Sequence, residues 1–324
     1  MQQFACFFIA CLAALMLPSA AYADSFPDKP VTLVVAFPPG GSSDVIARTL
    51  AAEMEEHLGQ PMIVEYHPGA GGNIAAKFVA RAPANGHTLL IGTSGPLATH
   101  AVLYRNLDYD PVKSFAPVIQ VGQLPNLVMV HPSVPASDLK ELVAYAQANP
   151  GKLSYASSGN GSASHLGGVL FSSKTGIDLL HVPYKGAAPA LNDVLGGQIS
   201  MSFTDVLAAL PHVRVGKLKA LGIASATRSS ALPEVPTLAE QGLQGYEVSV
   251  FFGIVAPAGT PADRVKKLNR AFAEVLAVPK VKQQLAAQGL EPPPATTPDQ
   301  LAKFIAAQMQ LWAPVIRQSG AQID

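Results

Sequence analysis

The sequence predicts an α/β fold built from two lobes that face each other across a cleft. Short apolar runs alternate with amphipathic stretches almost throughout the chain, which is typical of strands alternating with helices. The same local design, a strand followed by a Gly/Ser loop and a helix, occurs in the first third as FPPGGSSD (37–44) and in the middle third as YASSGNGSASHLGG (155–168). A chain of 324 residues is also long enough for two domains of ordinary size.

The first 23 residues are predicted to be a secretory signal. An apolar run from Phe4 to Leu17 is followed by Ala21-Tyr22-Ala23, an A-x-A site with cleavage after Ala23, although the leading MQQ carries no Lys or Arg. A transmembrane anchor is the alternative, but the run is short for a span of roughly 20 residues. A lipoprotein would use Cys11, which lies in a poor lipobox.

The mature chain would begin at Asp24 and hold 324 − 23 = 301 residues without cysteine, because Cys6 and Cys11 both precede it. Such a length can bury a large core without disulfides. Lys+Arg and Asp+Glu number 22 each, and the charges are dispersed with no basic stripe. The composition therefore argues against nucleic acid or an anionic membrane as a partner.

Nine strands are expected from apolar, β-branched runs. They are 31–36, 62–66, 88–92, 126–131, 153–156, 179–182, 199–203, 219–224 and 247–255. Helices are indicated by i, i+4 spacing, as in Ile46, Leu50, Met54 and Leu58. Similar faces occur over 139–146 and 301–312, and the alternation of strands and helices favours largely parallel sheets.

The two lobes are expected to comprise discontinuous stretches of chain. The first lobe would hold residues 24–124 and 250–324, and the second lobe residues 125–249. The chain would cross near Leu124-Pro125 and again near Tyr246 to Phe251, so that two crossover segments form a hinge. The mainly helical region 256–324 would complete the first lobe.

Six loops follow predicted strands at the edge where open α/β sheets bind ligands. They are 37–44, 67–73, 92–96, 155–168, 182–190 and 203–206, and they offer Gly, Ser, Thr and Asn with few charges. Amides at helix N-termini attract anions. The phosphate loop GxxxxGK[ST] is absent, and GxGxxG fails because Ser164 follows Gly159 and Gly161. A small carboxylate is therefore the expected ligand.

Catalytic and metal sites have weaker support in the sequence. A hydrolase would need Ser162, His165 and Asp205 to meet, yet no G-x-S-x-G elbow occurs and His165 is expected to bond locally in a first helical turn. The eight histidines show no HExxH, so neither a metal nor a cofactor is expected. The roles of Asp44, which could cap a helix, fix its loop or meet the ligand, and of Lys185 stay open.

Several stretches together resemble the Bug family, the periplasmic solute-binding proteins of tripartite tricarboxylate transporters. The resemblance covers most of residues 30–255, in the family's order. The matching stretches are VVAFPPGGSSDVIAR, HPGAGGNIAA, ANGHTLLIGTSG, LDYDPVKSFAPV, YASSGNGSASHL, HVPYKGAAPALNDVLGGQISMSF and LPEVPTLAEQG. It implies a two-lobed type II Venus-flytrap fold that holds a ligand carboxylate through loop amides, hydroxyls and ordered waters.

By motif position, the resemblance implies ligand contacts from both lobes. In the first lobe they are Pro39, Gly40, Gly41, Ser43, Asp44, Ala70, Gly72, Asn73, Thr93 and Ser94. In the second lobe they are Ser157, Ser158, Gly159, Ser162, His165, Tyr184 and Asp205. The chain departs from the family pattern at Ala75-Ala76, Pro96 and Thr204, where ligand specificity could differ.

The expected function is capture of a small carboxylate in the periplasm, by a monomer, for delivery to the membrane subunits of a tripartite transporter. The ligand could be a dicarboxylate, a tricarboxylate, an acidic amino acid or an aromatic acid. A ligand-sensing subunit for a membrane receptor is the main alternative, because docking surfaces carry no recognisable motif. A secreted hydrolase is the other.

Overall fold

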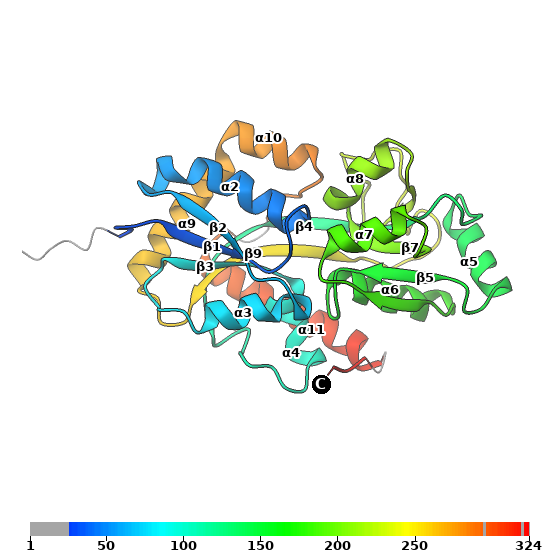
Figure 1. Ribbon diagram of the computed structural model, residues 1–324, viewed down its shortest axis with the longest axis horizontal. Coiled ribbons are helices and arrows are strands. Elements are labelled where there is room, and N and C mark those ends of the chain that lie inside the picture. Colours follow the sequence, from blue (N-terminus) through cyan, green and yellow to red (C-terminus); the bar gives the residue numbers. More distant parts are fainter. Residues whose placement is uncertain (1–25, 294–295, 319–320, 324) are drawn as a thin grey trace, which may run out of the picture.

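The computed structural model describes residues 26–293, 296–318 and 321–323. The predicted signal segment 1–23 lies outside the described residues. Figure 1 shows an elongated molecule in which helices flank a central set of strands along its whole length. Among the described residues, no helix is both long and apolar enough to cross a bilayer.

Within the described residues, one sheet of nine strands has the order β2-β1-β3-β9-β4-β7-β5-β6, with β8 also paired to β4. The strands are β1 (Val31–Val35), β2 (Met62–Tyr66), β3 (Thr88–Thr93), β4 (Phe115–Val130), β5 (Ser154–Ser157), β6 (Leu180–Pro183), β7 (Met201–Asp205), β8 (Lys219–Ile223) and β9 (Ser249–Pro257). All nine expected strands are present, most within two residues of the expected bounds.

The expected strand 126–131 is wrong at its start, because β4 begins at Phe115. Its first part pairs with β9, from Phe115↔Pro257 to Pro125↔Ser249, and its last part, Asn126–Val130, pairs with β7 and β8. Pro117, Gly122 and Pro125 interrupt the apolar pattern over 115–125, so the pattern did not predict a strand there. The two crossover segments are thus paired strands rather than loops.

The expectation of largely parallel sheets also needs correction. Parallel pairs lie at the two ends of the sheet, where β1 joins β2 and β3, and β5 joins β6 and β7. The middle is antiparallel, because β4 runs out to the second lobe and β9 runs back. The antiparallel centre therefore follows from the two crossings.

Helices cover both faces of the sheet (Figure 1). They are α2 (Ser42–Leu58), α3 (Asn73–Ala80), α4 (His100–Leu103), α5 (Leu139–Ala148), α6 (Ala163–Thr175), α7 (Ala187–Leu195), α8 (Val206–Arg214), α9 (Ala262–Ala277), α10 (Pro279–Ala287) and α11 (Pro298–Gln318), with the short turns η1 (Ala70–Gly72) and η2 (Gly95–Thr99). The expected face of α2 is buried at Ile46, Leu50, Met54 and Leu58. Region 256–324 is mainly helical, as expected.

The apolar core is divided by the sheet. One cluster joins α2, α9 and α10 to β1, β3 and β9, and another places α3 and α11 on the opposite face. In the second half of the sheet, α5 and α6 pack on one side and α7 and α8 on the other. The helices that follow the parallel strands β1, β5 and β7 by short loops are therefore fixed against the sheet by their buried faces.

Replacing the core residue Leu50, which is fully buried on α2, tests this packing. Leu50→Ala should lower the free energy of unfolding by about 2–5 kcal/mol, because the cavity left by the side chain is only partly refilled. Urea denaturation measures the change. Leu311→Ala, at a position 61% exposed on α11, is the control and should change stability by less than about 0.5 kcal/mol. Equal effects of the two changes would contradict this packing.

Candidate functional site

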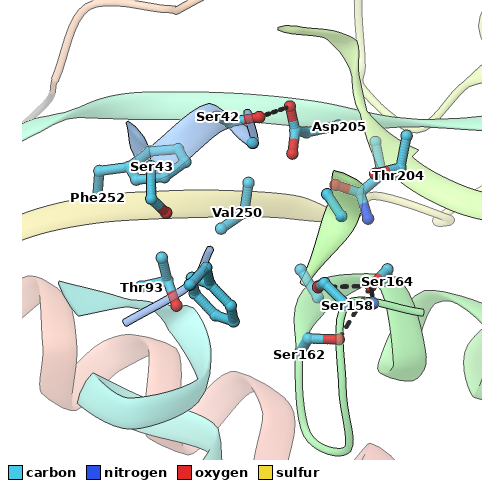
Figure 2. Close-up of a pocket in the computed structure, with 15 residues that line it drawn as sticks. Ser42, Ser43, Thr93, Ser158, Ser162, Ser164, Thr204, Asp205, Val250 and Phe252 are labelled. Carbon is cyan, nitrogen blue, oxygen red and sulfur yellow. Dashed lines mark hydrogen bonds between the residues drawn. The ribbon is translucent and has the colours of Figure 1, made fainter. Parts of the chain in front are cut away.

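A cavity lies where the loops after β1, β3, β5 and β7 meet above the crossing strands (Figure 2). It encloses about 490 Å³ of space free of atoms, including its opening to solvent. Fifteen residues line it: Phe37, Gly41, Ser42, Ser43, Thr93, Asn126, Ser158, Ser162, Ala163, Ser164, Ala187, Thr204, Asp205, Val250 and Phe252.

The loop FPPGGSSD brings the N-terminus of α2 to the cavity. Gly40 turns the chain with φ +93°, a conformation that L side chains rarely adopt, and Gly41 is the extended residue that precedes the helix. The carbonyl of Gly41 accepts from the N–H groups of Asp44 and Val45. The N–H groups of Ser42 and Ser43 have no acceptor within the helix, so they remain available at the cavity wall.

Asp44 fixes this loop and does not line the cavity. Its carboxylate accepts from the Gly40 N–H at 2.8 Å, from the Tyr66 hydroxyl at 2.5 Å and from Arg48 Nε at 2.6 Å. Burial raises the pKa of Asp44, but the bonds from Tyr66, Gly40 and Arg48 outweigh it and leave the pKa below the ordinary value. Of the roles open from the sequence, the structure favours fixing the loop.

The N-terminus of α6 reaches the cavity from the second lobe. Ser162 caps the helix by accepting from the His165 N–H, and its hydroxyl donates to the Gly159 carbonyl at 2.6 Å. The Ser164 hydroxyl lies within hydrogen-bond distance of the hydroxyls of Ser158 and Ser162. The N–H groups of Ala163 and Ser164 lie in the first turn, before any intrahelical partner exists. Two helix N-termini thus meet at one cavity.

Three hydroxyls of the lining have no hydrogen-bond partner among the described residues. Ser43, Thr93 and Thr204 are only 6%, 5% and 4% exposed. Figure 2 shows the Ser43 and Thr93 hydroxyls pointing into the space between the lobes. A hydroxyl group can both donate and accept, so these three groups are available to a polar ligand in the cavity.

Asp205 closes the cavity on the side of the second lobe. Ser42 Oγ donates to Asp205 Oδ1 at 2.5 Å and thereby joins the two lobes, while the N–H of Ala208 donates to the same oxygen at 3.1 Å. Asn126 lies opposite Asp205 in the β4–β7 register, and its Nδ2 donates to the Phe203 carbonyl. Burial raises the pKa of Asp205, against the bonds from Ser42 and the backbone.

A second contact between the lobes lies outside the cavity lining. Thr99 Oγ1 donates to the Gly161 carbonyl at 2.9 Å. Gly71 lies so close to the second lobe that a Cβ there would be 2.5 Å from the Asn160 carbonyl oxygen. The lobes are therefore in direct contact around the cavity, and the molecule is in a closed arrangement.

Six of the residues implied by the resemblance line the cavity: Gly41, Ser43, Thr93, Ser158, Ser162 and Asp205. Six first-lobe residues besides Asp44 lie outside the lining: Pro39, Gly40, Ala70, Gly72, Asn73 and Ser94. Asn73 Oδ1 bonds His100 Nδ1 and the Tyr109 hydroxyl, and Ser94 Oγ accepts from the Phe251 N–H. Their polar groups therefore support neighbouring segments.

Four second-lobe residues are also outside the lining: Ser157, Gly159, His165 and Tyr184. Ser157 Oγ bonds His181 Nε2, and the Tyr184 hydroxyl donates to Asp193 at 2.5 Å. Burial, followed by that bond to Asp193, raises the pKa of Tyr184 to about 12. Lys185 is exposed and does not reach the cavity.

The Ser-His-Asp arrangement considered from the sequence is not assembled. His165 Nδ1 accepts from the Gly161 N–H at 3.1 Å, which is the local bond expected of it, and burial lowers its pKa to about 4. Ser162 donates to the Gly159 carbonyl and Asp205 accepts from Ser42, so neither side chain is bonded to the imidazole ring of His165. Among the described residues, no group of three His, Cys, Asp or Glu side chains could hold a metal ion.

Sequence reasoning missed three polar residues of the lining: Ser42, Ser164 and Asn126. Ser42 is the neighbour of Ser43, and Ser164 lies two residues after Ser162. Only the position at which each helix begins shows which of these hydroxyls reach the cavity. Asn126 follows the crossover in a strand and carries no loop signal. Of the three departures from the family pattern, Thr204 lines the cavity, whereas Ala75-Ala76 are fully buried and Pro96 packs against Gly72.

Comparison with known proteins gives a consistent result. The profile of TctC, described as the tripartite tricarboxylate transporter family receptor, matches residues 46–321. The chain is 39% identical to Protein BugT of Bordetella pertussis over 313 residues, covering 96% of each chain.

Solved structures extend this likeness to the fold. An R. palustris protein solved with adipate is 38% identical, with a TM-score of 0.88 and coverage of 91% of this chain and 98% of that one. MatC from Rhodopseudomonas palustris, solved with bound malate, is 36% identical, with a TM-score of 0.86 and coverage of 90% and 100%. The expected two-lobed binding-protein fold is confirmed.

The hydrogen bonds to Asp44 predict an acid-sensitive contribution to stability. Asp44→Asn should lower the free energy of unfolding by about 1.5–3 kcal/mol near neutral pH, because bonds to a charged acceptor are lost. Since the pKa of Asp44 is lowered in the fold, its contribution is present above the ordinary value of 3.8 and disappears as the pH falls through the lowered value. Urea denaturation of both proteins from pH 7 to pH 3 measures this, and a difference that does not shrink in acid would contradict it.

Proposed function

Because the chain belongs to the TctC family, the receptors of tripartite tricarboxylate transporters, we propose that it captures a small carboxylate between its lobes and delivers it to a transporter of that type. The membership confirms the resemblance to the Bug family that the motifs indicated. The family and the fold are those of solute-binding proteins rather than enzymes. Two relatives solved with malate and adipate support a carboxylate as the ligand.

The observation that carries the proposal is the meeting of two helix N-termini at a cavity without a cation. The first turns of α2 and α6 reach it from opposite lobes, and its lining contains no Lys, Arg or His. Unpaired N–H groups and the positive ends of two helix dipoles favour a negative group there. The hydroxyls of Ser43, Thr93 and Thr204 would form hydrogen bonds with the other polar groups of the ligand.

The other residues implied by the resemblance would affect binding indirectly, by fixing the loops that carry the cavity lining. Asp44, Asn73 and Ser94 bond the segments that carry the lining. The cavity is narrow and closed by contacts between the lobes, so the ligand would enter an open form and be enclosed by hinge movement at β4 and β9. Closure of this kind is common for two-lobed binding proteins.

Export of the chain fits this function. A signal cleaved after Ala23 would deliver the mature protein to the periplasm, the compartment that the resemblance to the Bug family implies. The cavity is formed by residues of a single chain, so a monomer would suffice for binding. Membrane subunits of the tripartite transporter would be the partners that receive the ligand.

Changes at the two candidate anion-binding elements test the proposal. Gly41→Pro removes an N–H beside the α2 terminus and should weaken malate or adipate binding about tenfold or more, since one bond to a charged group contributes about 1.5–3 kcal/mol. Lys185→Ala, at an exposed position, should change affinity less than about twofold. Titration calorimetry measures both, with circular dichroism as the check on folding. Loss of binding in Lys185→Ala with normal binding in Gly41→Pro would contradict the amide site.

Lobe closure should accompany binding in solution. Small-angle scattering should give a smaller radius of gyration with saturating malate or adipate than without it, because contacts such as Ser42–Asp205 form only when the lobes meet. Gly41→Pro at the same ligand concentration is the control and should compact less. An unchanged radius at proven saturation would argue against hinge closure.

A further inference from the structure

The cavity is expected to hold an anionic ligand, yet its lining contains a buried acid, Asp205, and no positively charged side chain. Of its fifteen lining residues, Asp205 is the one with a titratable side chain. It is only 8% exposed. A ligand carboxylate enclosed here would place two negative charges in one poorly solvated space, which strongly disfavours ionisation of both.

The elements packed around Asp205 offer no positive side chain to offset that repulsion. On α2, Asp44 is the nearby titratable group, and its carboxylate is bonded to Gly40, Arg48 and Tyr66. On α6, His165 is buried with Nδ1 accepting an N–H, and its lowered pKa of about 4 keeps it neutral. Asp205 is the N-cap of α8, and the N–H groups of Leu207 and Ala208 donate to its carboxylate. The titratable residues of α7 and α8 are Asp193, His212 and Arg214, and these three lie outside the cavity lining, while β4 contributes only the neutral Asn126.

The two carboxyl oxygens of Asp205 are used differently. The bonds from Ser42 Oγ and from the Ala208 N–H both end on Oδ1. Figure 2 shows the other oxygen turned away from Ser42, toward the space enclosed by the lining side chains. Oδ2 is therefore the oxygen that can carry a proton and present it to a ligand, since a protonated carboxyl group is a hydrogen-bond donor.

We propose that Asp205 takes up one proton from solvent when the lobes close on a carboxylate and then donates a hydrogen bond to the ligand as a neutral carboxylic acid. The inference rests on the proposed function and adds that ligand capture is coupled to proton uptake. The bond from Ser42 across the lobes would hold Oδ1 in place, so that Oδ2 faces the ligand only in the closed form.

Such coupling has a definite sign. Burial raises the pKa of Asp205 above the ordinary 3.8 in the closed form, whereas the solvated side chain of an open form would titrate near the ordinary value. The closed complex therefore binds more protons than the open protein. For a ligand that stays ionised, affinity falls as the pH rises from 3.8 toward the raised pKa of the closed complex, by at most about tenfold per pH unit for one proton, and does not change above it.

Titration calorimetry can count the protons directly. Malate and adipate, both almost fully ionised at pH 6.5, are titrated in two buffers that differ in ionisation enthalpy. Native protein should take up close to one proton per ligand bound. Asp205→Asn, which keeps an acceptor for Ser42 and supplies an N–H donor, should take up none, and its affinity should no longer depend on pH. Asp193→Asn, which removes an acid outside the cavity, should retain the uptake of native protein.

The outcomes separate this inference from the function beneath it. Tight binding of either acid with no proton uptake by native protein would overturn the inference and leave the proposed function intact. Uptake that persists unchanged in Asp205→Asn would also overturn it. Failure of native protein to bind either acid would count against the proposed function and would remove the inference with it. If Asp205→Asn fails to fold, the proton count of native protein alone decides.

Discussion

Unpaired N–H groups at helix N-termini are the constraint on which this binding site depends. A helix cannot satisfy its first amides internally, and here α2 and α6 present theirs to one cavity from opposite lobes. The loop sequences follow from this need, because glycine permits the turn at Gly40 and serine adds hydroxyls without charge. A ligand that accepts hydrogen bonds from the first N–H groups of both helices would therefore also connect the two lobes.

The paired strands β4 and β9 make that arrangement possible. They cross between the lobes in opposite directions and are bonded to each other from Phe115 to Pro125. Asn126 on β4 and Val250 and Phe252 on β9 form part of the cavity wall. The hinge and the floor of the site are thus the same structure, so movement of the lobes changes the site directly.

Local sequence patterns predicted most elements but not their partners. Apolar periodicity placed α2, and composition marked the loops 37–44 and 92–96, because both signals are local. Ser43 and Thr93 were selected within these loops by the resemblance to the Bug family. The strand over 115–125 was missed because its stability comes from pairing with β9, and this pairing outweighs its own irregular pattern. The paired residues are far apart in sequence, from 249 − 125 = 124 to 257 − 115 = 142 residues. Ser42 and Asn126 were missed because their side chains meet Asp205 and Phe203 only after folding. The residue boundaries of the lobes stay a prediction.

The most direct test of the account is a crystal structure of the protein with malate or adipate at a resolution that defines the ligand. We expect a ligand carboxylate within about 2.7–3.2 Å of N–H groups in the first turns of α2 and α6. We also expect no Lys or Arg side chain in contact with it. A carboxylate held by a cationic side chain, or a ligand bound outside this cavity, would contradict the central claim.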